Sequence, residues 1–238
     1  MGIVLALEMA ADVARTSVQT VADAARGRLD RSRVDALCRA FGDRAVRRAR
    51  IALEVVGAER VPAGRAYVYM SNHQSHLDVP VLYATLPSPT VRMVGKKELF
   101  DIPVWGHAMR AAEMICIDRS DRARAIESLR AAGDKIRSGV SVWIAPEGTR
   151  SVSGRPGPLK RGGFHLALDS GTAIVPVAIS GTRRVLPSGG KSLTPGLPVR
   201  VVFGAPIEVA GKTADALSAE VAAFFAAHVD LALSGVER

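Results

Sequence analysis

A histidine and an aspartate, His73 and Asp78, are separated by four residues in the segment NHQSHLD at residues 72–78. A histidine held by a carboxylate can act as a general base and take the proton from an alcohol. About seventy residues later the chain reads PEGTR at residues 146–150, a glycine-containing turn that ends in an arginine. A guanidinium binds phosphate oxygens in bidentate fashion, and backbone N–H groups of a turn can join it. The two segments together indicate a phosphorylated polyol as the substrate.

The histidine and the aspartate can meet only if the segment turns, because residues five apart do not share a helix face. Residues 66–70 predict a short buried strand before the segment. Residues 78–80, with Asp at the cap and Pro in the first turn, predict the start of a helix. Alone, Asp78 reads as a plain helix cap and His73 as a loop histidine. Their pairing between a strand and a helix favours catalysis, with one imidazole nitrogen on the carboxylate and the other facing a hydroxyl.

The segment at residues 72–78 resembles the NHxxxxD motif of the glycerolipid acyltransferases, specifically the 1-acylglycerol-3-phosphate acyltransferases. Five further blocks are similar to the blocks of that family and follow in the same order. They lie at residues 96–106 (KxxLxxxPxxG), 114–119 (GxIFIxR), 146–151 (PEGTRS), 160–164 (FKKGAF) and 174–177 (apolar-Pro-apolar). The resemblance covers roughly residues 57–210. The chain departs from the pattern at Glu113, where the family often has Gly, and at Cys116 and Ala145, where it usually has Phe; these positions bear on pocket shape, not on the chemistry.

The resemblance implies transfer of a fatty acyl group from an acyl thioester to the free hydroxyl of 1-acylglycerol 3-phosphate, which gives phosphatidate in phospholipid biosynthesis. The acyl donor is acyl-CoA or acyl carrier protein, and the residues do not separate the two. His73 is the expected general base and Asp78 the group that orients it. The thioester and the alcohol react directly once they are oriented, so no covalent acyl-enzyme is needed. No metal and no bound cofactor are implied.

The expected substrate-binding residues lie within the matched blocks: Asn72, Ser75, Lys96, Arg119, Glu147, Gly148, Thr149 and Arg150. Arg119 and Arg150 are the expected phosphate ligands, with Lys96 in support. Glu147 is expected to orient Arg150 or to accept from a glycerol hydroxyl. Two alternatives stay open: an acyltransferase for a different lysolipid acceptor, and a catalytically silent membrane-binding module. The intact His73 and Asp78 argue against the second.

The chain has 238 residues, 48% of them hydrophobic, and a formal net charge of +9. A strongly basic protein seeks polyanions, and the sequence holds no nucleic-acid-binding motif. We therefore expect an anionic membrane surface and acidic substrates as partners, and no nucleic acid. The two cysteines, Cys38 and Cys116, form no CxxC motif, which predicts a reducing compartment and no disulfide.

Residues 1–56 predict an N-terminal module of two amphipathic helices. In the first helix, apolar residues recur at three- and four-residue steps: Val4, Leu7, Ala11, Ala14, Val18 and Val21. The second helix is expected from a capping box at residues 32–35 to about Glu54 and carries Arg44, Arg47, Arg48 and Arg50. One interpretation is a platform that rests on anionic headgroups, and the other is a solvated basic pair that covers the core. No segment has the length of apolar sequence that a membrane span requires, so we expect a peripheral protein at the cytoplasmic face of the membrane.

Strand and helix patterns alternate through residues 57–238, the expected acyltransferase domain. Strands are predicted at 90–94, 114–117, 141–144, 174–179 and 199–203, and helices at 121–138, 162–169 and 214–233. Such alternation is typical of an α/β fold, here with a mixed or largely parallel sheet flanked by helices. Both chemical segments follow predicted strands and would meet at the carboxyl edge of that sheet, where α/β folds bind their ligands.

Overall fold

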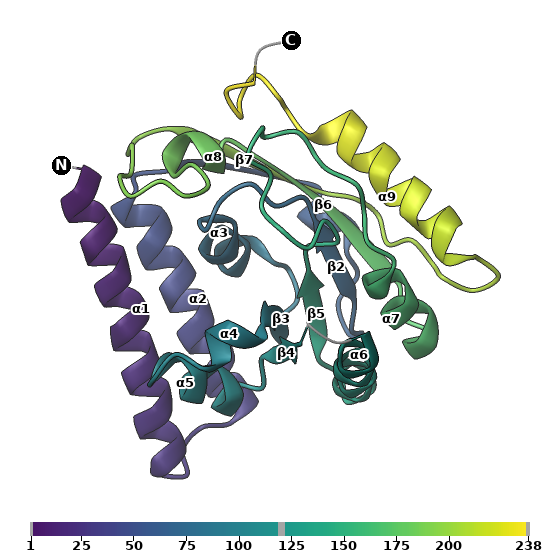
Figure 1. The fold of residues 1–238 in the computed structure, drawn as a ribbon, viewed down its shortest axis with the longest axis horizontal. Helices are drawn as coiled ribbons and strands as arrows, with labels where there is room; N and C mark the ends of the chain where they lie inside the picture. The colour runs from purple at the N-terminus through teal and green to yellow at the C-terminus, as the bar shows by residue number, and fades with distance from the viewer. Residues whose placement is uncertain (1, 119–121, 237–238) are drawn as a thin grey trace.

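A mixed seven-stranded sheet forms the centre of the computed structural model, which describes residues 2–118 and 122–236 (Figure 1). Its strands lie in the order β1 (Ala52–Val56), β7 (Pro198–Phe203), β6 (Ile174–Ser180), β2 (Val68–Ser71), β5 (Ser141–Ile144), β3 (Val91–Lys96) and β4 (Ile115–Ile117). Neighbouring strands are parallel except β6 and β7, which are antiparallel. The central strands are buried on both faces, which explains their continuous apolar sequence. The predicted fold class is confirmed.

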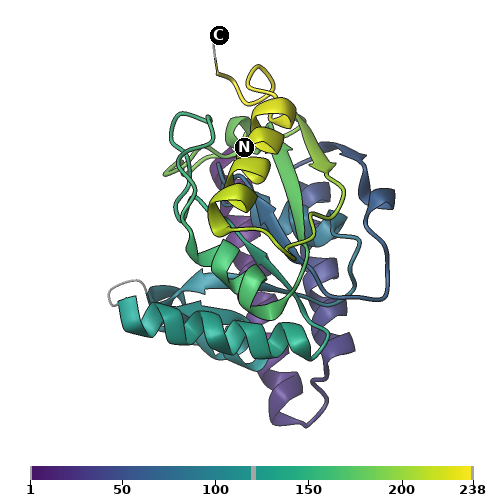
Figure 2. The same cartoon turned by 90° about the vertical axis from the view of Figure 1, so that its right-hand side faces the viewer.

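Helices cover both faces of the sheet. On one face α3 (Asp78–Thr85) packs on the strands, backed by α2 (Arg31–Arg48) and α1 (Gly2–Ala25). On the other face lie α6 (Arg122–Arg137), α7 (Gly162–Ser170) and α9 (Ala214–His228), which Figure 2 shows towards the viewer. The short elements are η1 (Ala58–Arg60), α4 (Lys97–Phe100), α5 (Trp105–Ala111) and α8 (Thr182–Val185), and α5 contacts α1.

Three predicted helix boundaries are wrong. Helix α2 has Asp30 at its N-cap and not Ser32, two residues before the expected capping box, because the Asp30 carboxylate accepts from the N–H of Arg33. It ends at Arg48 and not near Glu54, since Arg50 has a φ of 48° and the chain then pairs with β7 as β1. Helix α9 ends at His228 rather than at residue 233, because the following N–H of Asp230 donates to Ser180 Oγ.

Helix α1 turns its apolar stripe towards solvent. Leu7 is 66% and Val18 is 57% exposed, while Asp12 and Asp23 are buried on the opposite side of the helix. The buried carboxylates are paired with arginines of α2 and the turn before it: Asp12 with Arg44 and Arg48, and Asp23 with Arg28 and Arg33. Periodicity predicted this helix correctly, and the inward face is the polar one.

These ion pairs give two of the α2 arginines a partner within the protein. Arg48 Nε lies 2.6 Å from Asp12 Oδ2, and Arg44 Nε lies 3.5 Å from Asp12 Oδ1. Both guanidinium groups are therefore paired with α1, and the Arg48 side chain stays 38% exposed. Arg47 and Arg50 are exposed.

The division at residue 56 into an N-terminal module and a catalytic domain stays a prediction. Leu5 of α1 and Ala49 after α2 pack in the same apolar cluster as Tyr69 of β2. Strand β1, the last part of the expected module, is hydrogen-bonded into the sheet. Among the helices that the structure describes, none combines the length and the apolar character needed to cross a bilayer.

Candidate active site

Four adjacent strands bring the candidate residues to one edge of the sheet. Strands β6, β2, β5 and β3 are neighbours in that order and run parallel, so their carboxyl ends lie side by side. The first strand leads to Thr182, the second to His73, the third to Glu147, and the fourth ends at Lys96. The expected gathering at the carboxyl edge is thus present in the structure.

His73 and Asp78 are hydrogen-bonded, with 2.7 Å between His73 Nδ1 and Asp78 Oδ2. Asp78 is fully buried, whereas the His73 side chain is 17% exposed. The carboxylate engages Nδ1, which leaves Nε2 as the nitrogen that can receive a proton. The Trp143 ring packs edge-to-face against the imidazole, 5.8 Å between centroids, and restricts its orientation.

Asp78 was expected to cap α3, and the structure corrects this. The helix begins at Asp78, and Oδ2 accepts the N–H groups of Gln74 and Ser75, at 2.8 and 2.9 Å, which precede the helix. The carboxylate therefore closes the turn that brings His73 back to it. The two N–H donors and the carboxylate thus hold the turn closed.

Residues 146–151 hold the backbone of His73 from two sides. The N–H of His73 donates to Glu147 Oε1 at 2.8 Å, and its carbonyl accepts from the N–H of Ser151 at 2.7 Å. Glu147 Oε2 accepts from the N–H of Gly157 at 2.8 Å. Both oxygens of Glu147 are therefore used by backbone donors, which differs from the expected role of orienting Arg150 or a glycerol hydroxyl. Burial raises the pKa of Glu147, and the two backbone hydrogen bonds oppose that rise.

Asn72 and Ser75, expected to contact substrate, are buried and hydrogen-bonded to the backbone. The Asn72 amide pairs with both the N–H and the carbonyl of Ile179 on β6. Ser75 Oγ donates to the carbonyl of Leu186 and accepts the N–H of Leu77. Gln74, not foreseen from the sequence, also donates to the carbonyl of Ile179. These side chains thus anchor the loop of residues 72–77, called the histidine loop below, to β6 and to the segment after α8.

Positive charges surround the opening of the site. Burial lowers the pKa of His76, and the charges of Arg150 and Lys96 lower it further, so both of these cations lie near His76. Arg150 is half-buried, and among the described residues its Nη1 has no hydrogen-bond partner. A buried guanidinium N–H without a partner is suited to receive an anion. Arg119 lies outside the described residues.

Gly148 has a φ of +73° at the turn between Glu147 and Arg150. A Cβ at this position would lie 2.9 Å from Lys160 Nζ, so the lysine side chain passes directly over the glycine. Lys160 is placed there by its N–H, which donates to the carbonyl of Pro146 at 2.8 Å. Thr149 is exposed on the same turn. Lys160 therefore adds a cation to the site. The sequence placed this residue in a family block but indicated no role for it.

Sequence reasoning also missed Thr182. Its Oγ1 lies 2.5 Å from Asp78 Oδ1, and the side chain is fully buried. One signal was available, because Thr182 follows the carboxyl end of a predicted buried strand and so belongs to the same edge of the sheet as His73.

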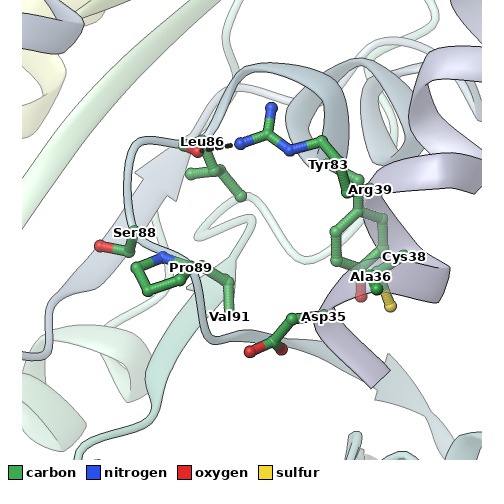
Figure 3. Close-up of a pocket in the computed structure, with 9 residues that line it drawn as sticks. All are labelled: Asp35, Ala36, Cys38, Arg39, Tyr83, Leu86, Ser88, Pro89 and Val91. Carbon is green, nitrogen blue, oxygen red and sulfur yellow. Dashed lines mark hydrogen bonds between the residues drawn. The ribbon is translucent and has the colours of Figure 1, made fainter. Parts of the chain in front are cut away.

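A cavity of about 220 Å³ lies elsewhere, between α2 and the segment from α3 to β3 (Figure 3). Its polar groups are already bonded within the protein. The Asp35 carboxylate accepts from Arg92 and Thr90, and Arg39 donates to the carbonyls of Ala84 and Leu86. The strand ends therefore remain the candidate active site.

Comparison with known proteins agrees with this location. The family model described as Acyltransferase matches residues 52–180, which include His73, Asp78 and Glu147. The chain is 33% identical over 180 residues to the chloroplastic 1-acyl-sn-glycerol-3-phosphate acyltransferase LPAT1 of Arabidopsis thaliana, covering 75% of this chain and 49% of that protein. It is 40% identical over 131 residues to 1-acyl-sn-glycerol-3-phosphate acyltransferase alpha of Homo sapiens, covering 55% of this chain and 46% of that protein.

A solved structure is similar over most of its length. The crystal structure of the 1-acyl-sn-glycerophosphate (LPA) acyltransferase PlsC from Thermotoga maritima matches with a TM-score of 0.73 and 29% sequence identity. The match covers 82% of this chain and 78% of that one. By contrast, the chain spans about half the length of the curated relatives described above.

Proposed function

The chain belongs to the acyltransferase family, and on that premise we propose that it acylates the free hydroxyl of a lysophospholipid, with 1-acylglycerol 3-phosphate as the acceptor. The observation that carries the proposal is the His73–Asp78 pair, held by the backbone hydrogen bonds of residues 146–151, which also bear Arg150. The base and the phosphate ligand are thereby parts of one rigid unit. The named activity of similar proteins supports this choice of acceptor.

In the proposed reaction His73 Nε2 removes the proton of the acceptor hydroxyl while the oxygen attacks the thioester carbonyl carbon. Asp78 keeps the proton of the neutral imidazole on Nδ1 and stabilises the imidazolium that forms. The tetrahedral intermediate collapses, the C–S bond breaks, and the imidazolium returns the proton to the leaving thiolate. The products are an ester and a free thiol, of coenzyme A or of acyl carrier protein.

The phosphate of the acceptor is assigned to Arg150, supported by Lys96, with Arg119 as a further proposed ligand. The buried Nη1 of Arg150 supports this assignment, because it has no partner among the described residues. At the same turn the N–H of Gly148 already donates to the carbonyl of Ala145 at 3.0 Å, so Lys160 above it and Thr149 beside it are the groups proposed to contact a phosphate or an oxyanion.

We further propose that the protein lies on an anionic membrane at its cytoplasmic face. The outward apolar stripe of α1, with Leu7 and Val18, supports this proposal, because exposed apolar residues along one side of a helix suit the headgroup boundary. Attraction of the headgroups is assigned to Arg47 and Arg50, since Arg44 and Arg48 pair with Asp12.

Mass spectrometry of the products from a panel of lysolipids, with acyl-CoA and with acyl carrier protein as donors, tests the proposal. We expect phosphatidate from 1-acylglycerol 3-phosphate, and His73→Ala to slow its formation by about two to four orders of magnitude. His165→Ala, at an exposed histidine of α7, is the matched control and retains wild-type turnover. A preferred acceptor without a phosphate monoester would favour the other lysolipid class, and wild-type turnover in folded His73→Ala would remove the mechanism.

A further inference from the structure

The carboxylate of Asp78 is bound at both oxygens. Oδ2 accepts from His73 Nδ1 and from the N–H groups of Gln74 and Ser75. Oδ1 accepts from Thr182 Oγ1 at 2.5 Å, and within the described residues this hydroxyl is its one partner. Both Asp78 and Thr182 are fully buried, so water does not replace a missing donor without a rearrangement.

Thr182 is held in place by parts of the chain that lie far from the histidine loop in the sequence. The preceding Gly181 has a φ of +95°, and a Cβ there would lie 2.3 Å from the carbonyl oxygen of Pro198. The N–H of Gly181 donates to Ser234 Oγ, and Arg183 donates to the carbonyls of Val152 and Ser234. The turn at residues 231–235 and the loop at residues 151–155 therefore fix the start of α8.

We propose that Thr182 is a positioning residue, which extends the His73–Asp78 pair to a hydrogen-bonded set of three residues. A carboxylate can rotate about its Cβ–Cγ bond, and donors on both oxygens stop that rotation. With Oδ1 tied to Thr182, Oδ2 stays directed at Nδ1, and Nε2 keeps the direction that the reaction needs. This role rests on the proposed function, in which His73 is the base.

The hydroxyl also sets the strength of the base. Each donor to a carboxylate spreads its negative charge, and removing one makes the carboxylate a stronger acceptor for the imidazole N–H. Loss of the Thr182 hydroxyl should therefore make His73 hold its proton to higher pH. The titratable and charged groups near this pair are His76, the Glu147 carboxylate that accepts the His73 N–H, and the cations Arg150 and Lys96. The Trp143 ring that packs on the imidazole is neutral.

Thr182→Ala and Thr182→Ser are the decisive variants, because they differ by a single oxygen atom. For Thr182→Ala we expect kcat to fall about tenfold to hundredfold, the usual effect of leaving a buried charged acceptor without its donor. We also expect the acidic limb of its pH–rate profile to move to higher pH, with little change in the KM for the acyl donor. Thr182→Ser should restore both properties. If the alanine variant does not fold, Thr182→Val, which keeps the side-chain volume, takes its place.

An NMR titration of the His73 imidazole provides a readout that does not need activity. Thr182→Ala should raise the titration midpoint, while Thr182→Ser should match the wild type. The control is Thr85→Ala, which removes a buried hydroxyl that bonds the carbonyl of Val81 within α3, and it should leave the midpoint unchanged.

A wild-type midpoint and wild-type kcat in Thr182→Ala would overturn the inference. A serine variant that behaves like the alanine variant would overturn it too, because the methyl group would then be the important part. If the wild-type enzyme acylates no lysolipid, the proposed function fails, and the titration still decides whether Thr182 positions Asp78.

Discussion

At the residue scale, the histidine loop is organised by hydrogen bonds that end on backbone atoms. The His73 backbone bonds Glu147 and Ser151, and Asp78 collects the N–H groups of its own turn. These contacts use backbone atoms of His73 and leave its side chain free for the reaction. The imidazole is therefore oriented before a substrate arrives. Such preorganisation is the basis for expecting large effects from single substitutions at this edge of the sheet.

Arg150→Ala should weaken use of 1-acylglycerol 3-phosphate by roughly 2 kcal/mol, the strength of a charge-assisted contact to phosphate. The loss should appear in the dependence of rate on acceptor concentration and not on donor concentration. Steady-state kinetics with each substrate varied in turn measures both.

Arg137→Ala is the control for the change in net charge, because Arg137 pairs with Asp134 on the exposed side of α6. If Arg150→Ala keeps the wild-type acceptor dependence, the phosphate is held by other residues or the acceptor has no phosphate monoester.

The spacing of His73 and Asp78 was enough to predict their contact, because a strand, a turn and a helix start leave few other arrangements. The role of Glu147 was not predictable in the same way. Its partners are the N–H groups of His73 and Gly157, and backbone donors have no signature in a sequence. Thr182 stands 104 residues from Asp78 and lies outside any motif recognised in the sequence, so only the sheet order brings it into view.

At the element scale, periodicity predicted helices and strands better than their ends. The end of α2 depends on Arg50 in the left-handed region, where glycine or asparagine is the usual residue and arginine gives no warning. Glu113 takes a φ of 60° at the place where the family often has Gly. Its carboxylate is bound by Arg31 and Lys135.

The packing of α2 against α3 should weaken in alkali. Burial raises the pKa of Cys38 to about 11, and burial raises the pKa of Tyr83 well above its ordinary value. The unfolded chain therefore releases these protons at lower pH than the folded protein does. Stability is fully present below the ordinary thiol pKa and falls as pH rises towards about 11, by about 1.4 kcal/mol per pH unit for each proton.

Urea unfolding between about pH 8 and pH 11 measures this slope. Cys38→Ala removes the contribution of the thiol, so its stability should decline less steeply with pH than that of the wild type. Parallel declines would show that the thiol does not titrate differently in the two states.

At the scale of the whole molecule, the alternation of strands and helices predicted the α/β class and the edge that holds the site. The orientation of α1 was beyond that reasoning. An apolar stripe normally faces the core, and here the buried face carries Asp12 and Asp23 because α2 supplies arginines to pair with them. Amphipathic periodicity predicts that a helix has an apolar and a polar face. It does not predict which face is buried, because that depends on the residues of the partner helix.

The outward stripe of α1 makes a membrane test possible without dismantling the fold. Deleting residues 1–50 would remove Leu5, Val34 and Ala49, which are buried in the core, so point variants are the sharper choice. Leu7→Asp combined with Val18→Asp changes only exposed positions. Each apolar side chain contributes about 1.5–3 kcal/mol when fully buried, so the double variant should lose most binding to anionic liposomes.

Cosedimentation at increasing salt completes the membrane test. Arg47 and Arg50 should contribute about 1 kcal/mol each near an anionic surface, so salt should weaken binding only moderately, because Arg44 and Arg48 are bound to Asp12. Val55→Asp is the control, since Val55 is an exposed apolar residue on the edge strand β1 and is not part of the α1 stripe. Its binding should equal that of the wild type.

Equal cosedimentation of the Leu7→Asp, Val18→Asp double variant and the wild type would place the lipid-facing surface elsewhere on the molecule. Binding that disappears at moderate salt while the double variant still binds would instead assign attachment to the arginines.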